Sequence, residues 1–180
     1  MKIYLMRHGT TIWNEECRTQ SRSQNKLSKQ GKALTEEVAK KLKKEKIDVI
    51  YSSPLMRTMQ TANIINQYHN VKINRCELLT EIDQGIFAGR LKNSLTEKEK
   101  QLKAERHPIT KMEPFESVTN RAKEFIEKVL KSEKHKNILV VSHNIICSIL
   151  EYLLTKTTPD FSDYDKLNIF GNAEVKIFEI

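Results

Sequence analysis

Two histidines in the chain stand directly after apolar runs and have arginine or other polar neighbours. His8 follows the apolar residues that open the sequence and is preceded by Arg7, whereas His143 follows the apolar run 138–141. Arg57 lies a few residues after a third apolar run. A neutral imidazole is nucleophilic near pH 7, and guanidinium groups match phosphate oxygens in charge and shape. These residues predict phosphoryl-group chemistry, with His8 as the nucleophile and His143 and both arginines as stabilisers of the phosphoryl oxygens.

An attack on phosphorus also needs an acid that protonates the departing oxygen. Glu81 comes shortly after the apolar pair Leu78-Leu79, so we expect it at the same edge of the fold as the histidines. A carboxyl group near phosphate oxygens has a raised pKa, which suits proton donation near neutral pH. Glu81 is therefore the predicted general acid, and Asp83 is the alternative.

The hydrophobic pattern predicts alternating strands and helices that would position these residues. Apolar or β-branched runs predict strands at 3–5, 47–51, 71–79, 138–141 and 174–180. Apolar residues that recur every three to four positions predict helices at 28–44, 55–67, 96–106, 116–131 and 145–154. Strand–helix alternation of this kind is typical of an α/β fold, a three-layer α/β/α sandwich around a mostly parallel central sheet.

The arrangement of such a sheet brings distant residues together. The carboxyl ends of parallel strands share one edge, where ligands bind, so His8, Arg57 and His143 are expected to converge there. The alternating pattern of 174–180 indicates a strand with one wet face, at the edge of the sheet. No linker or repeat is visible, and the length fits one domain over 1–180.

The composition limits the partners and the compartment. The sequence has 31 Lys+Arg against 23 Asp+Glu, a net charge of +8, which attracts anions even though many lysines belong to solvated helix faces. Its 3 cysteines lack C-x-x-C spacing, which argues against a disulfide framework or a zinc ribbon. No apolar run is long enough to cross a bilayer, and the apolar start is too short for a signal peptide. We expect a cytoplasmic protein without a nucleic-acid or membrane partner, and a homodimer is left open.

Several segments resemble those of a known family. Residues 7–14 are similar to the R-H-G-x-T-x-x-N signature of the histidine phosphatase superfamily, which includes the cofactor-dependent phosphoglycerate mutases. Residues 52–62 resemble its S-S-x-x-x-R-x-x-Q-T-A segment, and residues 79–85 resemble L-x-E-x-x-x-G. Residues 116–121 and 141–143 are similar to two further blocks, so the likeness covers nearly the whole chain.

The resemblance implies a role for each site residue. His8 would be phosphorylated and then dephosphorylated by water, and Glu81 would act first as acid and then as base. The residues that would hold the phosphoryl group are Arg7, Asn14, Arg57 and His143. No metal or organic cofactor is implied. On other readings Asn14 braces the loop, Arg57 caps a helix and Glu81 is a surface carboxylate.

Some positions depart from the family pattern. Ser21 stands after Gln20 where glycine is usual, and Asn144 follows the second histidine where glycine is common. Phe115 replaces the glycine often found before the block at 116–121. Glycine lets backbone approach a ligand closely, so these changes bear on substrate shape. Gln20, Ser21 and Asn144 are predicted substrate contacts.

Three functions are compatible with these features. The leading hypothesis is a phosphomonoesterase that hydrolyses a phosphorylated small molecule; the alternatives are a phosphoglycerate mutase and a non-catalytic phospho-ligand binder. The mutases that resemble this chain usually carry a longer insertion between acid and second histidine than the roughly sixty residues here, which favours hydrolysis. Non-catalytic members typically lose a histidine or the acid, and this chain keeps them. Basic residues near the predicted mouth favour an acidic or multiply phosphorylated substrate: Arg18, Arg22 and Lys26.

Overall fold

A five-stranded sheet forms the centre of the computed structural model, which describes residues 1–157 and 169–180. Its strands are β1 (Lys2–Arg7), β2 (Val49–Ser52), β3 (Ile73–Arg75), β4 (Asn137–Ser142) and β5 (Val175–Glu179). The strand order is β3-β2-β4-β1-β5; β1 to β4 pair in parallel and β5 pairs antiparallel with β1. The prediction of a mostly parallel sheet is confirmed.

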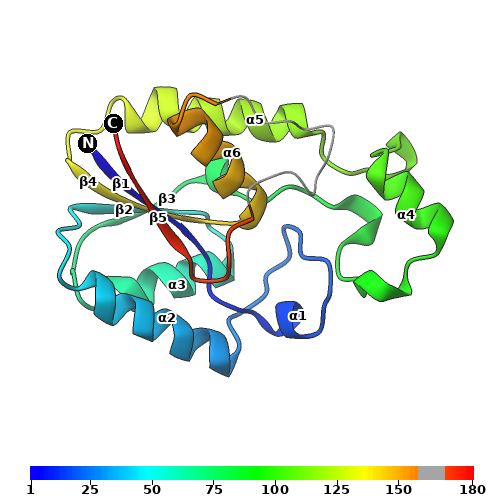
Figure 1. Cartoon of the computed structure of the whole chain (residues 1–180), viewed down its shortest axis with the longest axis horizontal. Helices are drawn as coiled ribbons and strands as arrows, with labels where there is room; N and C mark the ends of the chain where they lie inside the picture. Colours follow the sequence, from blue (N-terminus) through cyan, green and yellow to red (C-terminus); the bar gives the residue numbers. More distant parts are fainter. Residues whose placement is uncertain (158–168) are drawn as a thin grey trace.

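Helices cover both faces of this sheet. The described helices are α1 (Ile12–Glu15), α2 (Lys29–Leu42), α3 (Met56–Asn66), α4 (Glu97–Ala104), α5 (Phe115–Glu124) and α6 (Asn144–Leu154), and four of them form these two layers. Figure 1 shows α2 and α3 on one face and α5 and α6 on the other. The expected three-layer α/β/α sandwich is therefore what the chain forms.

Side chains of β1 point alternately to the two faces of the sheet, and both sets are apolar, so helices must cover both faces. Ile3 and Leu5 pack into the core cluster that includes α5 and α6 residues. Tyr4 and Met6 point the other way, into the cluster formed with α2 and α3. All four side chains are almost fully buried. A strand with two buried faces reads as a continuous apolar run, and this one does.

Two elements differ from the sequence-based expectation. The strand predicted at 71–79 is only three residues long, because its partner β2 ends at Ser52, which pairs with Arg75. A 3₁₀ helix, Glu77–Leu79, follows. The helix predicted at 116–131 widens after α5 into a π-helical segment, Phe125–Leu130. A wider turn brings residues five apart onto one side, and Phe125 and Leu130 are both buried.

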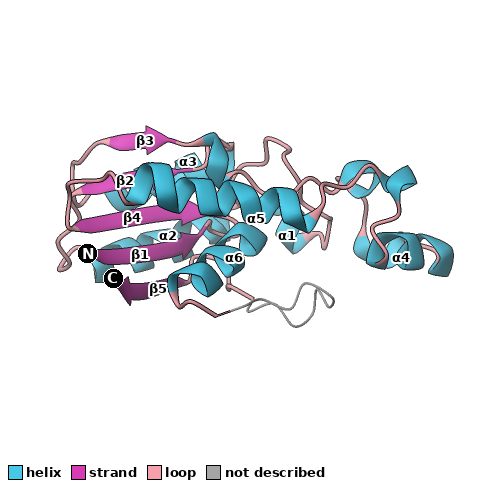
Figure 2. Cartoon of the chain, turned by 90° about the horizontal axis from the view of Figure 1, so that it is seen from above, coloured by secondary structure: helices cyan, strands magenta, loops and turns pink. Residues whose placement is uncertain are grey.

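The sheet presents its carboxyl edge to a peripheral segment. Figure 2 shows the arrowheads of β1, β2 and β4 pointing toward the side of the molecule where α4 lies beyond the sheet. β5 occupies the opposite edge from β3, as predicted for 174–180, and its Ile177 side chain is 49% exposed. None of the helices within 1–157 and 169–180 combines the length and apolar character that crossing a membrane requires.

Candidate active site

His8 lies immediately beyond β1 and is 2% exposed. Its Nδ1 is 2.7 Å from the carbonyl oxygen of Gly9. A carbonyl can only accept, so Nδ1 carries the proton and Nε2 carries the lone pair. Burial, followed by the charges of Arg57 and Arg7, holds the pKa of His8 well below its ordinary value. His8 is therefore a neutral imidazole with Nε2 as its basic atom.

The loop after His8 depends on a glycine because two helices approach it closely. A Cβ atom on Gly9 would lie 2.3 Å from Thr35 Oγ1 of α2, which no side chain tolerates. The Gly9 amide donates to Thr61 Oγ1 of α3 at 3.0 Å. Helices α2 and α3 thus fix the backbone that orients His8.

His143 and Arg57 form a buried pair next to His8. The two histidine rings lie edge to face with centroids 5.3 Å apart. Arg57 Nε donates to His143 Nδ1 at 3.1 Å, so His143 Nε2 carries the proton and donates to Ser53 Oγ at 2.9 Å. Burial and the Arg57 charge hold the pKa of His143 well below its ordinary value. His143 is consequently neutral as well.

The Arg57 guanidinium is fully buried and is held on three sides. Besides His143, it binds the carbonyl oxygens of Ser23 at 2.9 Å and Ser21 at 2.8 Å. Burial lowers its pKa to about 10, so it stays charged at neutral pH. The neighbouring carboxyl of Glu81 acts in the opposite direction and raises that pKa. The site therefore contains a permanently charged guanidinium next to the two neutral imidazoles of His8 and His143.

Glu81, the predicted general acid, is 7% exposed. One carboxyl oxygen, Oε1, accepts the Ile82 amide at 3.0 Å. Burial raises the pKa of Glu81, against the lowering effect of this hydrogen bond and of Arg57. Asp83, the alternative acid, instead uses Oδ1 to accept Ser21 Oγ at 3.0 Å and the Gly85 amide at 2.9 Å. The geometry favours Glu81, because Asp83 is occupied in holding its own loop.

Two asparagines present amide nitrogens to the site. The Asn14 Oδ1 atom accepts Thr11 N at 3.0 Å and Thr11 Oγ1 at 2.9 Å, in a capping box that begins α1. The Asn144 Oδ1 atom accepts the Phe170 amide at 3.0 Å. With both oxygens engaged, the Nδ2 groups remain as donors for an anion.

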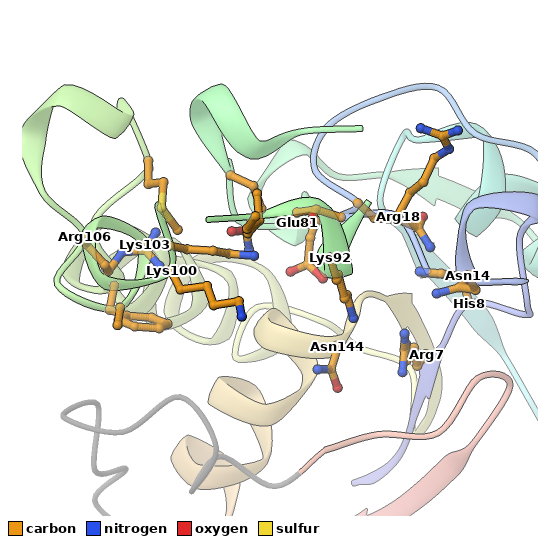
Figure 3. Close-up of a pocket in the computed structure, with 17 residues that line it drawn as sticks. Arg7, His8, Asn14, Arg18, Glu81, Lys92, Lys100, Lys103, Arg106 and Asn144 are labelled. Carbon is orange, nitrogen blue, oxygen red and sulfur yellow. The ribbon is translucent and has the colours of Figure 1, made fainter. Parts of the chain in front are cut away.

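A cavity of about 570 Å³ connects these groups. Of the predicted site residues, those that line it are Arg7, His8, Asn14, Gln20, Glu81 and Asn144. Figure 3 shows Arg7, His8 and Asn14 at one end and the α4 side chains Lys100 and Lys103 at the other. The cavity thus extends from the two strand ends, β1 and β4, to the peripheral helix.

Three predicted site residues do not line this cavity. Arg57 and His143 contact each other beside His8, and Ser21 is buried with its carbonyl on Arg57 and its hydroxyl between Asp83 and the Gln84 amide. Ser21 therefore positions Arg57 in this structure. Its role as a substrate contact, like the individual roles of the other site residues, stays a prediction.

Part of the cavity wall consists of basic residues that were not predicted as site residues. Lys92, Lys100, Lys103 and Arg106 all line it. Of the three basic residues that the sequence placed at the mouth, Arg18 lines the cavity, Arg22 forms a salt bridge with Glu113 at 2.8 Å, and Lys26 is not among the lining residues. The recurrence of basic residues in 92–106 was the available signal.

The described residues contain no group of three or more His, Cys, Asp and Glu side chains placed to hold a metal ion. The two histidines instead stand beside Arg57 and Arg7, whose charges also lower their pKa values. The expectation that no metal or organic cofactor is used stays a prediction.

Known proteins are similar to this chain in sequence and in fold. Phosphoserine phosphatase 1 of Hydrogenobacter thermophilus is 34% identical over 167 residues, 87% of this chain and 79% of the relative. A protein of Serratia proteamaculans named "Probable phosphoglycerate mutase GpmB" is 30% identical over 156 residues, 83% of this chain and 73% of the relative. The solved structure of YhfR from Bacillus stearothermophilus superposes with a TM-score of 0.88 at 24% identity, covering 99% of this chain and 91% of that one.

The family model for the histidine phosphatase superfamily (branch 1) matches residues 3–180. The match includes both histidine segments, the Arg57 segment and the Glu81 segment, which the geometry brings to one edge of the sheet. The chain belongs to the histidine phosphatase superfamily.

Proposed function

We propose that this protein is a phosphomonoesterase that hydrolyses a phosphorylated small molecule through a phosphohistidine on His8. One observation carries the proposal: a neutral His8, with its Nε2 lone pair available, and a buried Glu81 with a raised pKa line the same cavity. A nucleophile and a proton donor at one cavity are the two groups that ester cleavage requires.

In the first step, His8 Nε2 attacks phosphorus and the ester P–O bond breaks. Glu81 gives its proton to the departing oxygen, so the leaving group departs as an alcohol and Glu81 becomes a carboxylate. The charges of Arg7 and Arg57 favour the phosphoryl oxygens as negative charge develops on them. The Asn14 and Asn144 Nδ2 groups supply neutral donors to the same oxygens.

In the second step, water attacks phosphorus and the P–N bond breaks. The Glu81 carboxylate takes a proton from that water, inorganic phosphate forms, and His8 returns to its neutral state. Burial of Glu81 favours the first step, because a raised pKa makes the protonated form that gives up the proton more accessible than in an ordinary glutamate.

Rapid-quench labelling tests the covalent step. With a phosphomonoester carrying labelled phosphate, the wild type should give an acid-labile, base-stable adduct, and His8→Ala should give none and lose turnover. His135→Ala is a matched control, since His135 is exposed and precedes the N-terminal end of β4, whereas His143 follows the C-terminal end. Wild-type turnover in His8→Ala would contradict the proposal.

The mutase alternative needs its own assay, because one of the relatives bears that name. Incubation with 3-phosphoglycerate, with and without bisphosphoglycerate, separates the two reactions. We expect release of inorganic phosphate from a preferred phosphomonoester and no efficient isomerisation. Isomerisation without net phosphate release would assign the chain to the mutases. A cytoplasmic location and a homodimer stay predictions.

A further inference from the structure

The far end of the cavity is strongly cationic. Among residues 1–157 and 169–180, six basic side chains line the cavity, against one acidic side chain, Glu81, which burial biases toward its uncharged form. The six are Arg7, Arg18, Lys92, Lys100, Lys103 and Arg106. One phosphoryl group at His8 accounts for Arg7, which stands next to it in sequence, and leaves the cations from 92–106 without a function.

Lys92 and Lys103 are the least neutralised of these cations. Arg18 pairs with Glu16 at 2.5 Å and Lys100 pairs with Glu97 at 2.7 Å. Within 1–157 and 169–180, no salt bridge involves Lys92 or Lys103, the two lysines that Figure 3 shows projecting into the cavity together with Lys100. Two like charges left unpaired near each other favour an anion between them.

Lys103 is also partly withdrawn from water. Its Nζ lies 5.6 Å from the ring centroid of the buried Phe87. Burial, together with the charges of Lys92 and Arg106, lowers the pKa of Lys103. An anion beside Lys103 would therefore offset a cost that the protein bears without it.

The wall between the two ends holds polar atoms that have no hydrogen-bond partner among the described residues. Gln84 is 6% exposed and Thr19 is 3% exposed, and the atoms Gln84 Oε1 and Thr19 Oγ1 are buried without a hydrogen bond from that part of the chain. Gln20 Oε1 is in the same condition. All three side chains line the cavity. The side chains between the two ends are therefore polar, which suits a ligand whose middle part also carries hydrogen-bonding groups.

We propose that the substrate is a small phosphomonoester whose organic part carries a second anionic group, a carboxylate or a second phosphate, bound by Lys92 and Lys103. The inference rests on the proposed function, since the second anion is defined relative to a phosphoryl group at His8. Lys100 and Arg106 contribute less: Lys100 is paired with Glu97, and Arg106 stacks on Phe115 and donates to the Glu113 carbonyl.

A matched series of ligands tests this assignment. The series is phosphooxybutanoate, its uncharged amide, butyl phosphate and the bisphosphate of butanediol, each assayed for turnover and as a competitive inhibitor of p-nitrophenyl phosphate hydrolysis. We expect the carboxylate or the bisphosphate to bind about tenfold or more tightly than the amide, the effect of one favourable ion pair of about 1.4 kcal/mol. Comparison of the two charged ligands identifies which anion the site takes.

Variants assign the effect to the two lysines. In Lys92→Gln and in Lys103→Met, which keeps an apolar stem against Phe87, the preference for the charged ligand over the amide should shrink severalfold, mainly through KM. Lys98→Gln, on the same helix as Lys103, is the matched control, because Lys98 is exposed and is not among the residues that line the cavity. The preference should persist in that variant.

The outcomes separate this inference from the proposed function. Equal binding of the charged and uncharged ligands, in a protein that hydrolyses p-nitrophenyl phosphate, would overturn the second-anion site alone. If p-nitrophenyl phosphate is not hydrolysed and no phosphohistidine forms, the proposed function fails; calorimetric binding of the four ligands then still decides the second-anion site. A charged-ligand preference that survives in both lysine variants would also overturn the assignment.

Discussion

His8 and Glu81 illustrate how burial prepares two residues of opposite charge type for one reaction. Desolvation disfavours the charged form of each, which lowers the pKa of the imidazole and raises that of the carboxyl. The result is a neutral imidazole at His8 and a carboxyl group at Glu81 that keeps its proton to higher pH than an ordinary glutamate does. The charge of Arg57 lowers both pKa values, so it adds to the effect of burial on His8 and opposes the effect of burial on Glu81.

Replacing Glu81 by Gln should separate stability from activity. A carboxyl whose pKa is raised by folding stabilises the protein below its ordinary pKa, and that stabilisation is lost as pH rises through the raised value. Glu81→Gln removes this loss, so its free energy of unfolding should exceed that of the wild type increasingly with pH, by on the order of 1 kcal/mol above neutrality. Turnover should fall at least about 100-fold.

Urea denaturation at several pH values, with steady-state assays, measures both effects. Glu116→Gln is the control, because Glu116 is exposed and is not among the residues that line the cavity. A Glu81→Gln protein that loses stability relative to wild type as pH rises would show that the carboxylate is stabilised, not penalised, by its surroundings.

Ser53 is the hydrogen-bond partner of the His143 Nε2 atom. Its hydroxyl accepts the His143 Nε2 proton, so Ser53→Ala leaves a buried N–H without a partner at a cost of about 1–3 kcal/mol. We expect kcat to fall about tenfold with a smaller change in KM. Ser52→Ala is the comparison, since Ser52 is equally buried but its hydroxyl donates to the Ser53 carbonyl and not to His143. Equal kinetics in the two variants would exclude a role for the His143 proton.

At the scale of elements, α5 holds the segment that carries Glu81. Arg121 of α5 donates through Nη1 to the carbonyl oxygens of Leu78 and Thr80, each at 2.9 Å. Its other nitrogens, Nε and Nη2, bind the Glu113 carboxylate, each at 3.1 Å. One planar guanidinium therefore ties a helix to the backbone on the N-terminal side of the acid.

Arg121→Lys should loosen that connection. A single ammonium cannot reach both carbonyls and the carboxylate, so we expect a stability loss of about 1–3 kcal/mol. Because the acid would then be held less accurately, kcat should fall about tenfold or more with little change in KM. Lys123→Gln, exposed on the same helix, should leave both unchanged. A loss of stability with wild-type kcat would assign Arg121 to folding alone.

The strand ends were predictable from sequence, because the relevant signals are local. The apolar runs of β1 and β4 each end in a histidine, and parallel strands share their carboxyl edge. The ring-nitrogen partners of His143 were not predictable, since Ser53 and Arg57 lie 90 and 86 positions away. Nor was the cationic wall, because which side of 92–106 faces the cavity depends on where α4 packs beyond the sheet.

At the scale of the whole molecule, both ends of the chain close the active site. β5 pairs with β1, and the Ala173 amide donates to the His8 carbonyl at 3.1 Å. Arg7 donates to the Phe170 carbonyl, whose amide in turn binds Asn144. The site therefore requires residues from the first strand and from the last segment.

Acid sensitivity of the whole fold follows from those two buried histidines. Each has a folded pKa well below the ordinary 6.5, so the unfolded chain binds more protons as soon as pH falls beneath that value. Stability should therefore decline as pH drops from about 6.5 to about 5, before carboxylates with ordinary pKa values near 4.5 begin to contribute. His69, whose pKa is also lowered by burial, adds to the same decline.

The free energy of unfolding, measured by urea denaturation across that pH window, tests this expectation. His8→Asn should decline less steeply than wild type, and His69→Asn should remove a smaller part of the slope, because His69 is less buried than His8. Ring-proton NMR titration of the folded wild type measures the histidine pKa values directly and needs no substitution. Histidine resonances of His8 and His143 that titrate near 6.5 in the folded protein would contradict the neutral-imidazole site, and with it the nucleophile.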